Sequence, residues 1–436
     1  MTPQNPTPSR TAHIRALALR DPAAAEAPLA ALLADLFAIK PLNLNINLDQ
    51  YSLNSLNGFF DTPDGAFFFK FHQEEGEEGM AGEYYRADIL ARAGLPVDQP
   101  VLMSTLPGEQ ILIYRRRDEP RFSDVLRTLD LADDTAQRAI AVAAERQLSQ
   151  RLSATYRDTL HPISPEQAAA EPIHRLFHER LIDRAPYAFP GGRYRDFYVG
   201  QRFPLPGHVL EWADLSTRRF TVNGATYAST LGELFTAAEE RLRPEHLADA
   251  GGVVAHGDAH NANVWFSREG DGARLSYFDP AFAGEHVPSL LAEIKTSFHN
   301  IFAHPFWLYE PALASEWFSA EMALEPGRLI VETDWRLSPI RAELLAVKAR
   351  EVWRPLLADL KSRNMLPPDW RQVIRLGLFL CPTLVMNLRA GVRAHTEISS
   401  LIGLCVAVMV GSAPVEGDDT VTRFLEAIDP DRRPGL

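Results

Sequence analysis

The hydrophobic positions of the first part of the chain change their period along the sequence. Residues 12–40 carry alanine and leucine at helical spacing, which predicts one or two helices. From Leu42 to Leu48 apolar and polar residues alternate strictly, as LNLNINL, and this alternation is typical of a half-buried strand. Two further apolar runs flank Asp61–Gly65, whose sequence DTPDG is a strong turn signal. These runs predict a β-hairpin.

A helix and a second hairpin are predicted to follow. Gly79–Ala93 has helical character and ends at Gly94, a good helix terminator. The apolar runs Pro100–Met103 and Gln110–Tyr114 flank the turn sequence LPGE. Residues 42–116 therefore predict a small antiparallel sheet with one helix.

The pattern becomes mainly helical after residue 117. Asp134–Tyr156 repeats apolar residues every four positions, and Pro165–Leu181 predicts a second helix. Residues 186–228 interrupt this pattern with aromatic residues and prolines. From about Ser289 we expect helices to dominate to the C-terminus.

Three segments follow from these changes of pattern. Residues 1–41 are an N-terminal extension, expected to be disordered to about Ser9 and then helical, because the opening is polar and rich in proline. Residues 42–116 form the small sheet unit. Residues 117–436 form a mainly helical unit that carries the 186–228 segment as an insertion.

Composition narrows the class of protein. The formal net charge of −13 disfavours nonspecific binding to nucleic acid or anionic lipid, although it is compatible with a cationic ligand. The two cysteines, Cys381 and Cys405, lie in apolar helical sequence without CxxC spacing, which predicts buried thiols. The N-terminus lacks the apolar core of a signal peptide, and no apolar stretch reaches the roughly 20 residues of a membrane span. We expect a soluble cytoplasmic protein with no nucleic-acid or membrane partner; its oligomeric state is left open.

One segment carries candidate chemistry. The sequence VVAHGDAHNANVWF at Val253–Phe266 contains the pattern H-G-D-x-x-x-x-N. Phosphoryl transfer needs a carboxylate that orients the attacking hydroxyl, and Mg²⁺ prefers carboxylate and amide oxygens as ligands. Asp258 meets the first need, and Asn263 with Asp279, which ends the next apolar strand, meets the second. The alternative is that Asp258 and Asn263 only cap turns.

A lysine in an apolar strand is the second candidate. Lys70 lies in the run FFFKFH, and a buried ammonium needs an anionic partner. Nucleotide phosphates and Glu83, in the predicted helix, are the expected partners. The acidic residues between Glu74 and Glu78 are predicted to be solvated. The alternative for Lys70 is an edge-strand side chain that faces water.

The sequence HGDAHNAN resembles the signature of the aminoglycoside phosphotransferase and choline kinase superfamily, H-G-D-x-H-x-x-N. In that resemblance Asp258 is the catalytic base, Asn263 the first metal ligand and Asp279 the counterpart of the kinase DFG aspartate. The stretch from Glu83 to Val97 also resembles the family's helix and the entry into its fourth strand. It supports Glu83 as the ion-pair partner of the strand lysine.

The resemblance implies a two-lobed protein-kinase-like fold of the α+β class. Its N-lobe would be a small antiparallel sheet with one key helix, and its mainly helical C-lobe would carry the catalytic loop at 253–266. ATP and Mg²⁺ would be the cofactors. A hydroxyl of a small molecule would be the acceptor, such as an aminoglycoside, a sugar, choline or another amino-alcohol. The alternatives on the same scaffold are a nucleotidyl transferase and a nucleotide-binding regulatory protein.

The sequence differs from the family's pattern in the predicted phosphate loop and in the region after the metal aspartate. The predicted phosphate loop Ser52–Gly58 has one glycine at its end, so we expect Ser55, Asn57 and Gly58 to bind phosphate oxygens through side chains and backbone amides. His256 and His260 are expected to position the catalytic loop. About a dozen residues after the metal aspartate, relatives often place another aspartate; here the nearest acidic residue is Glu293.

The acceptor side is left open between two interpretations. The aromatic residues and arginines of the insertion form either a lid or a segment that packs on itself; they are Tyr187, Phe189, Arg193, Tyr194, Arg195, Phe197 and Tyr198. A second group, farther along the chain, lines the acceptor site or forms a core cluster; its members are His299, His304, Phe306, Trp307 and Tyr309.

Overall fold

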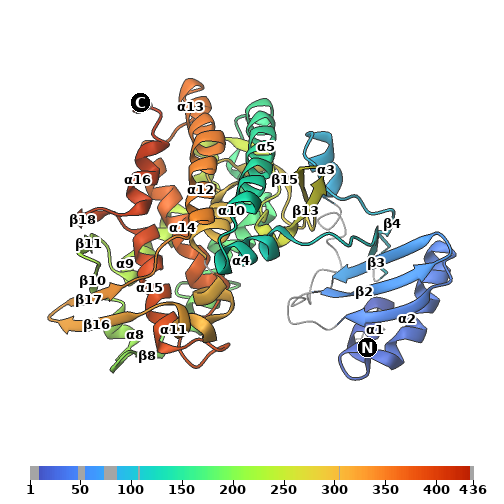
Figure 1. Cartoon of the computed structure of the whole chain (residues 1–436), viewed down its shortest axis with the longest axis horizontal. Helices are drawn as coiled ribbons and strands as arrows, with labels where there is room; N and C mark the ends of the chain where they lie inside the picture. The colour runs from blue at the N-terminus through green and yellow to red at the C-terminus, as the bar shows by residue number, and fades with distance from the viewer. Residues whose placement is uncertain (1–8, 48–54, 73–85, 107–108, 304, 433–436) are drawn as a thin grey trace. The chain divides into compact units, whose positions relative to one another are not determined.

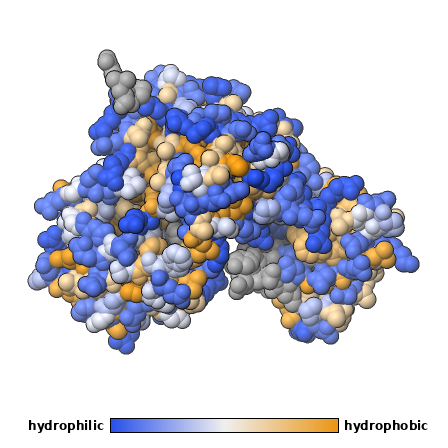
Figure 2. Space-filling view, viewed as in Figure 1, coloured by the Kyte–Doolittle hydropathy of each residue, from blue (hydrophilic) through white to orange (hydrophobic). Residues whose placement is uncertain are grey.

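The computed structural model describes residues 9–47, 55–72, 86–106, 109–303 and 305–432 (Figure 1). The chain divides into two compact units, the first made of residues 1–88 and 97–119 and the second of residues 89–96 and 120–436. No helix within the described ranges is long and apolar enough to cross a bilayer. The face seen in Figure 2 is mostly hydrophilic, with apolar residues exposed between the polar ones.

The first unit is built on a five-stranded antiparallel sheet in the order β1-β2-β3-β5-β4. Its strands are β1 (Leu42–Asn47), β2 (Ser55–Thr62), β3 (Gly65–His72), β4 (Leu102–Ser104) and β5 (Ile111–Arg115). Both predicted hairpins form: Thr62 pairs with Gly65 at the end of the first, and β4 pairs with β5 in the second. The small antiparallel sheet of the predicted α+β class is confirmed.

Two N-terminal helices complete the core of this unit. Helices α1 (Arg10–Ala18) and α2 (Pro22–Phe37) contribute apolar side chains to one hydrophobic cluster with β1, β2, β3 and β5. In β3 the side chains of Phe67, Phe69 and Phe71 belong to that cluster. Because side chains alternate across a strand, Lys70 lies on the opposite face of the sheet.

The structure describes only the second half of the helix predicted at Gly79–Ala93. Helix α3 runs over Ala87–Arg92, and Arg86 lies outside it. Glu83 falls outside the described residues, so its predicted pairing with the strand lysine stays a prediction.

The second unit is mainly helical, as predicted. Its α-helices are α4 (Phe122–Leu131), α5 (Thr135–Thr159), α6 (Pro165–Ala170), α7 (Gly192–Tyr198), α8 (Trp212–Leu215), α9 (Leu231–Arg241), α10 (Ile294–Ser297), α11 (Ala314–Trp317), α12 (Pro339–Lys348), α13 (Arg354–Ser362), α14 (Trp370–Val385), α15 (Glu397–Gly411) and α16 (Thr420–Ala427). Short 3₁₀ segments lie at Pro172–Leu176, His178–Arg180, Pro244–Ala250, Asn261–Asn263 and Pro311–Leu313, and π segments at Phe298–Phe302, Pro305–Tyr309 and Ala349–Trp353.

Strands of this unit form a second five-stranded sheet and four two-stranded ones. The large sheet has the order β16-β17-β10-β11-β18 and the small sheets are β12-β15, β13-β14, β6-β7 and β8-β9. The strands are β6 (Asp183–Arg184), β7 (Tyr187–Ala188), β8 (Arg202–Leu205), β9 (His208–Glu211), β10 (Arg219–Val222), β11 (Ala225–Tyr227), β12 (Gly252–Ala255), β13 (Val264–Glu269), β14 (Gly272–Tyr277), β15 (Gly284–Pro288), β16 (Ala320–Glu325), β17 (Arg328–Thr333) and β18 (Pro414–Glu416).

Two expectations about this unit were wrong. The helix predicted over Pro165–Leu181 ends at Ala170, because Pro172 has no amide hydrogen and holds Glu171 in an extended conformation. The region after Ser289 is also not continuously helical, since the β16–β17 hairpin interrupts it. Strand β17 pairs in parallel with β10 of the insertion, a long-range contact that local pattern does not encode.

The insertion at 186–228 folds into the core of the second unit. The rings of Tyr194 and Phe235 stack with centroids 4.0 Å apart, and those of Tyr198 and Trp212 lie 4.8 Å apart. Tyr194 and Tyr198 are buried. These contacts support the packing interpretation of the insertion over the lid.

A buried ion triad joins three segments of the second unit. The Lys348 ammonium lies 3.1 Å from carboxylate oxygens of both Glu145 and Glu293, and the Tyr156 hydroxyl donates to Glu293 at 2.7 Å. Burial and the hydrogen-bonded Glu293 carboxylate both raise the pKa of Tyr156. Glu293, the acidic residue nearest the family's additional aspartate, therefore serves this structural triad.

Removing the lysine of the triad tests its structural weight. Lys348→Met leaves two carboxylates buried without their cation, so we expect a loss of about 3–5 kcal/mol in the free energy of unfolding, measured by urea denaturation. The control is Lys361→Met, which breaks an exposed pair with Asp431 and should cost at most about 1 kcal/mol. Equal losses in the two variants would contradict the assigned role of Lys348.

Candidate active site

The loop after β12 is shaped by one glycine. Gly257 has φ +76, in the left-handed region that side chains disfavour, and a Cβ atom there would lie 2.5 Å from the Phe282 carbonyl oxygen. Conformation and space therefore both require glycine between His256 and Asp258. The local backbone geometry therefore explains why glycine stands in the middle of the H-G-D sequence.

His256 connects this loop to the end of the neighbouring strand. Its Nδ1 atom accepts the backbone N–H of Asp258 at 3.3 Å, which leaves Nε2 to donate to the Phe278 carbonyl at 3.0 Å. Burial lowers the pKa of His256, so the ring stays neutral and both contacts persist. The residue before Asp279 and the backbone of Asp258 are thus held by a single imidazole.

The β13–β14 hairpin brings the two predicted metal ligands together. Val264 pairs with Tyr277, and the Phe278 N–H donates to the Asn263 carbonyl at 3.0 Å. Asn263 therefore lies beside Asp279, the residue that follows Phe278. The Asp279 backbone has φ +55, an uncommon conformation for a residue with a side chain and one that is enriched at functional sites.

The oxygen atoms of this pair fit a hard divalent cation. The Asn263 Nδ2 atom donates to the Asp258 carbonyl at 2.9 Å, so the amide oxygen is the atom that remains for a ligand. Asp279 supplies a carboxylate. One amide oxygen and one carboxylate, with the remaining positions left to water and phosphate, is a donor set that suits Mg²⁺.

The Asp258 carboxylate lies between two cationic or basic side chains. Its Oδ1 atom is 3.4 Å from the Lys295 ammonium, and its Oδ2 atom is 3.8 Å from Nε2 of His260. Burial alone would raise the pKa of Asp258, but the charges of Lys295 and then His260 outweigh burial and lower it. Asp258 is therefore ionised at neutral pH and can accept a proton.

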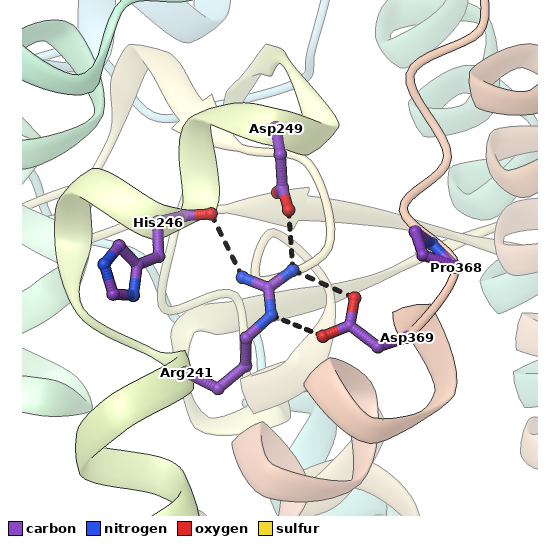
Figure 3. A pocket seen from close by; sticks show the side chains of 5 residues that line it. All are labelled: Arg241, His246, Asp249, Pro368 and Asp369. Atoms are coloured by element: carbon purple, nitrogen blue, oxygen red, sulfur yellow. Dashed lines mark hydrogen bonds and ion pairs between the residues drawn. The ribbon is translucent and has the colours of Figure 1, made fainter.

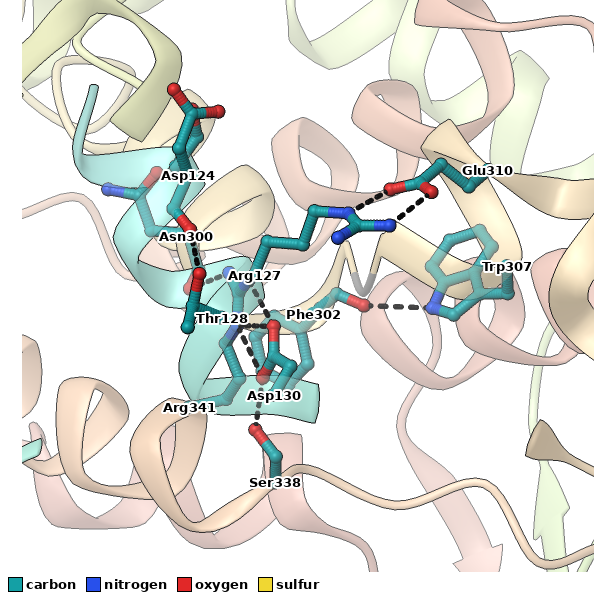
Figure 4. Close-up of polar contacts among 11 residues, drawn as sticks. Asp124, Arg127, Thr128, Asp130, Asn300, Phe302, Trp307, Glu310, Ser338 and Arg341 are labelled. Atoms are coloured by element: carbon teal, nitrogen blue, oxygen red, sulfur yellow. Dashed lines mark hydrogen bonds and ion pairs between the residues drawn. The ribbon is translucent and has the colours of Figure 1, made fainter. Parts of the chain in front are cut away.

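A buried polar network supports the loop from behind (Figure 4). The Asn300 side chain accepts the backbone N–H of Asn261 at 2.8 Å, and the Asn300 carbonyl accepts from Arg341 at 2.7 Å. Arg341 also donates to both carboxylate oxygens of Asp130, whose side chain is fully buried. Helices α4 and α12 thus fix the segment on which the catalytic loop rests.

The predicted donor-side residues lie in the first unit. Asn57 of β2 pairs directly with Lys70 of β3, so both side chains lie on the sheet face opposite the α1–α2 core. Ser55 and Gly58 belong to strand β2 as well, whereas the sequence placed them in a loop. A Cβ atom on Gly58 would lie 2.0 Å from the Asn45 carbonyl oxygen, so the packing of β1 requires this glycine.

Sequence reasoning missed several residues beside the catalytic loop. Lys295 and Asn300 were not singled out, and His299 was assigned only to an undecided group. A signal did exist for Lys295, because it is a charged residue within the apolar run SLLAEIKTSF. Of that undecided group, Phe306 and Trp307 are core residues, and His304 lies outside the described residues.

A separate hollow of the second unit involves none of the candidate site residues (Figure 3). Its centre is Arg241, which donates to Asp369 at 2.6 Å, to Asp249 at 2.7 Å and to the His246 carbonyl at 3.0 Å. These contacts occupy every nitrogen of the guanidinium. The cluster is a structural clamp between α9 and the start of α14.

In chain order, a sheet with a lysine on the face opposite its α1–α2 core precedes a helical unit that carries the aspartate and asparagine of one loop and then a strand-end aspartate. This order of elements is the one that the resemblance found in the sequence implies.

No protein-family model and no curated protein matches the sequence. Among solved structures, the chain is similar to a thermostable mutant of the aminoglycoside phosphotransferase APH(4)-Ia, at 12% identity and a TM-score of 0.43, with 87% of this chain and 98% of that chain covered. It is also similar to the spectinomycin phosphotransferase APH(9)-Ia in complex with ADP and spectinomycin, at 13% identity and a TM-score of 0.39, with 88% of this chain and 96% of that chain covered. A third similar structure is a microcompartment-associated aminopropanol kinase, at 13% identity and a TM-score of 0.36, with 85% of this chain and 90% of that chain covered. All three are small-molecule kinases or phosphotransferases.

The glycine of the catalytic loop provides a test of the loop geometry. Gly257→Ala adds both an unfavourable φ and a clash with the Phe282 carbonyl, whereas the control Gly270→Ala, at φ +56 with open space around it, adds only the first. We expect Gly270→Ala to cost about 1–2 kcal/mol of unfolding free energy and Gly257→Ala about 1–3 kcal/mol more, in urea denaturation. Similar losses in the two variants would contradict the close approach of Phe282.

Proposed function

We propose that this protein is an ATP-dependent phosphotransferase that moves the γ-phosphate of ATP to a hydroxyl group of a small molecule. One observation carries the proposal: His256 and the β13–β14 hairpin hold the ionised Asp258, Asn263 and Asp279 at one place. A proton acceptor and a pair of oxygen ligands next to each other are the two requirements of this chemistry.

Asp258 is assigned the role of base. Its carboxylate orients the acceptor hydroxyl and takes the hydroxyl proton during transfer. The acceptor oxygen forms a bond to the γ-phosphorus while the bond to the bridging oxygen of ADP breaks, and ADP leaves with that electron pair. His256 and His260 are assigned positioning roles, His256 through the backbone of Asp258 and His260 beside its Oδ2 atom.

Donor-side roles are proposed within each unit separately. Asn263 and Asp279 would hold Mg²⁺, which when bound neutralises charge on the phosphates of the nucleotide. Lys70, together with Asn57 on the same sheet face, would contact the phosphates, and Glu83 would pair with that lysine. Ser55, at the start of β2, would offer its backbone amide, and Gly58, three residues further along the strand, would keep β1 packed against β2 because it has no side chain.

Replacing the base tests the transfer step. Asp258→Asn keeps the size of the side chain but removes the proton acceptor, so we expect ADP production with a responsive acceptor to fall by about 10²–10⁴-fold. Thermal stabilisation by Mg-ATP should persist. The control is Asp271→Asn, at the exposed tip of the β13–β14 hairpin.

Two outcomes would count against this assignment. Unchanged turnover in Asp258→Asn would exclude the base role. Release of pyrophosphate in place of ADP by the wild-type protein would identify nucleotidyl transfer instead.

Replacing the strand lysine tests the donor side. Lys70→Met removes the cation from the sheet face, and the loss of a charge-assisted contact should weaken Mg-ATP binding by about tenfold or more. The measurement is the dissociation constant from thermal-shift titration. The control is Lys40→Met, an exposed lysine of the same unit; equal weakening in both variants would contradict the role of Lys70.

A further inference from the structure

Two histidines meet beside β12, the strand that leads into the catalytic loop. Gly252 of β12 exchanges both of its backbone hydrogen bonds with His161, at 2.9 and 3.1 Å. Strand β15, which carries His286, pairs with the other edge of β12. The Nε2 atom of His161 and the Nδ1 atom of His286 lie 2.9 Å apart. The two imidazoles therefore link the segments that flank β12.

The neighbours of the two rings fix which nitrogen carries a hydrogen. A carbonyl oxygen only accepts, so Nδ1 of His161, which lies 2.7 Å from the Thr159 carbonyl, carries one. In the neutral ring Nε2 then accepts, and Nδ1 of His286 donates to it. The Nε2 atom of His286 is left to accept from the Gln167 amide nitrogen, 3.4 Å away. With both rings neutral, each of these contacts has one donor and one acceptor.

The Gln167 amide is fixed in its orientation by helix α6. Its Oε1 atom accepts the backbone N–H of Ser164 at 2.9 Å, and the Ser164 hydroxyl accepts the backbone N–H of Gln167 in return. This capping box leaves the Gln167 nitrogen for His286. A proton on Nε2 of His286 would therefore face an amide N–H, and a proton on Nε2 of His161 would face the Nδ1–H of His286. Either protonation places two donors against each other.

The surroundings of the pair favour neutral rings. Burial has the largest effect on His286 and lowers its pKa; the charge of His161 lowers this pKa further, and Glu285 raises it by less. Glu285 is exposed and forms an ion pair with Arg92 at 3.4 Å. Glu171 accepts the backbone N–H of His286 at 2.8 Å. Further titratable or charged side chains on the neighbouring elements are Arg157 and Asp158 of α5, Glu166 of α6, Glu245, His246 and Asp249 of the 3₁₀ segment, and Arg363, which donates to the Leu160 carbonyl.

We propose that His161 and His286 form a pH-sensitive contact, which holds β12 between the end of α5 and β15 while both rings are neutral and fails when either ring is protonated. Acidic pH then loosens the strand from which the catalytic loop continues. The inference does not rest on the phosphotransferase function.

The direction of the pH effect follows from proton binding. The pKa of His286 is lower in the folded protein than the ordinary value of about 6.5, so between these two values the unfolded chain binds more protons than the folded protein. The contribution of the pair to stability is therefore fully present above about pH 6.5 and is lost as the pH falls from there to the lowered pKa of His286.

Two substitutions each remove one titrating ring and keep the shared hydrogen bond. His286→Asn retains an amide donor near the Nδ1 position, and His161→Gln retains an oxygen acceptor near the Nε2 position. The control is His208→Asn, which replaces an exposed histidine of β9. Hydrogen exchange of residues 252–255 is measured by mass spectrometry at pH 7.5 and 5.5, and each rate is divided by the rate of the unfolded chain at the same pH.

We expect acidification to reduce the protection of residues 252–255 in the wild type and in His208→Asn. This reduction should exceed that in His286→Asn and in His161→Gln by about threefold or more, since one unit of pKa shift corresponds to a factor of ten. Peptides from β10 and β17 serve as an internal reference, and their protection should change equally in all four proteins.

Three results would overturn the proposal. The first is a reduction of equal size in the wild type and in both variants. The second is a loss of protection by the same factor at both pH values in the variants, which would make the pair a structural contact without a response to pH. If neither variant folds at pH 7.5, the wild type decides, and a reduction at residues 252–255 no larger than in the reference peptides is the third.

Discussion

The two hydrogen bonds of the buried His256 ring are the contacts on which the candidate site depends. One side of the ring binds the backbone of Asp258 and the other binds the carbonyl before Asp279. Since burial keeps the ring neutral, Nδ1 accepts while Nε2 donates, and the two contacts do not compete. The proposed base on one loop and a proposed metal ligand at a strand end are thereby linked through their backbones.

The rest of the second unit supports this arrangement with charges that are paired inside the protein. Arg341 and Asp130 hold Asn300, which binds the backbone of the loop that follows β12. Lys348 forms an ion pair with Glu293, two residues before Lys295 in the sequence. Buried ion pairs contribute little net stability, but removing one partner is costly. Such pairs therefore specify one arrangement of the segments around the loop.

The sequence contained the local part of this site and little of its surroundings. His256, Asp258, Asn263 and Asp279 were recognisable because their spacing follows from one loop and one hairpin. Lys295 and Asn300 reach the loop through tertiary packing, and no periodicity reports which way a side chain in an apolar run will point. The β10–β17 pairing was missed for the same reason, since it joins strands about a hundred residues apart. The helix ending at Ala170, by contrast, was available from Pro172 and was overlooked.

The net charge of the chain and the charges beside Asp258 act over different distances. The chain carries −13 overall, which by itself is compatible with a cationic ligand. Exposed charges are screened within about 10 Å at moderate ionic strength, whereas buried charges act at short range in a medium of lower dielectric constant. The buried Lys295, whose ammonium lies 3.4 Å from Asp258, therefore has more influence on that carboxylate than the acidic surface has. Lys295 offsets the cost of burying the Asp258 carboxylate, and this pair keeps a charged group in the place where the proposed function needs a base.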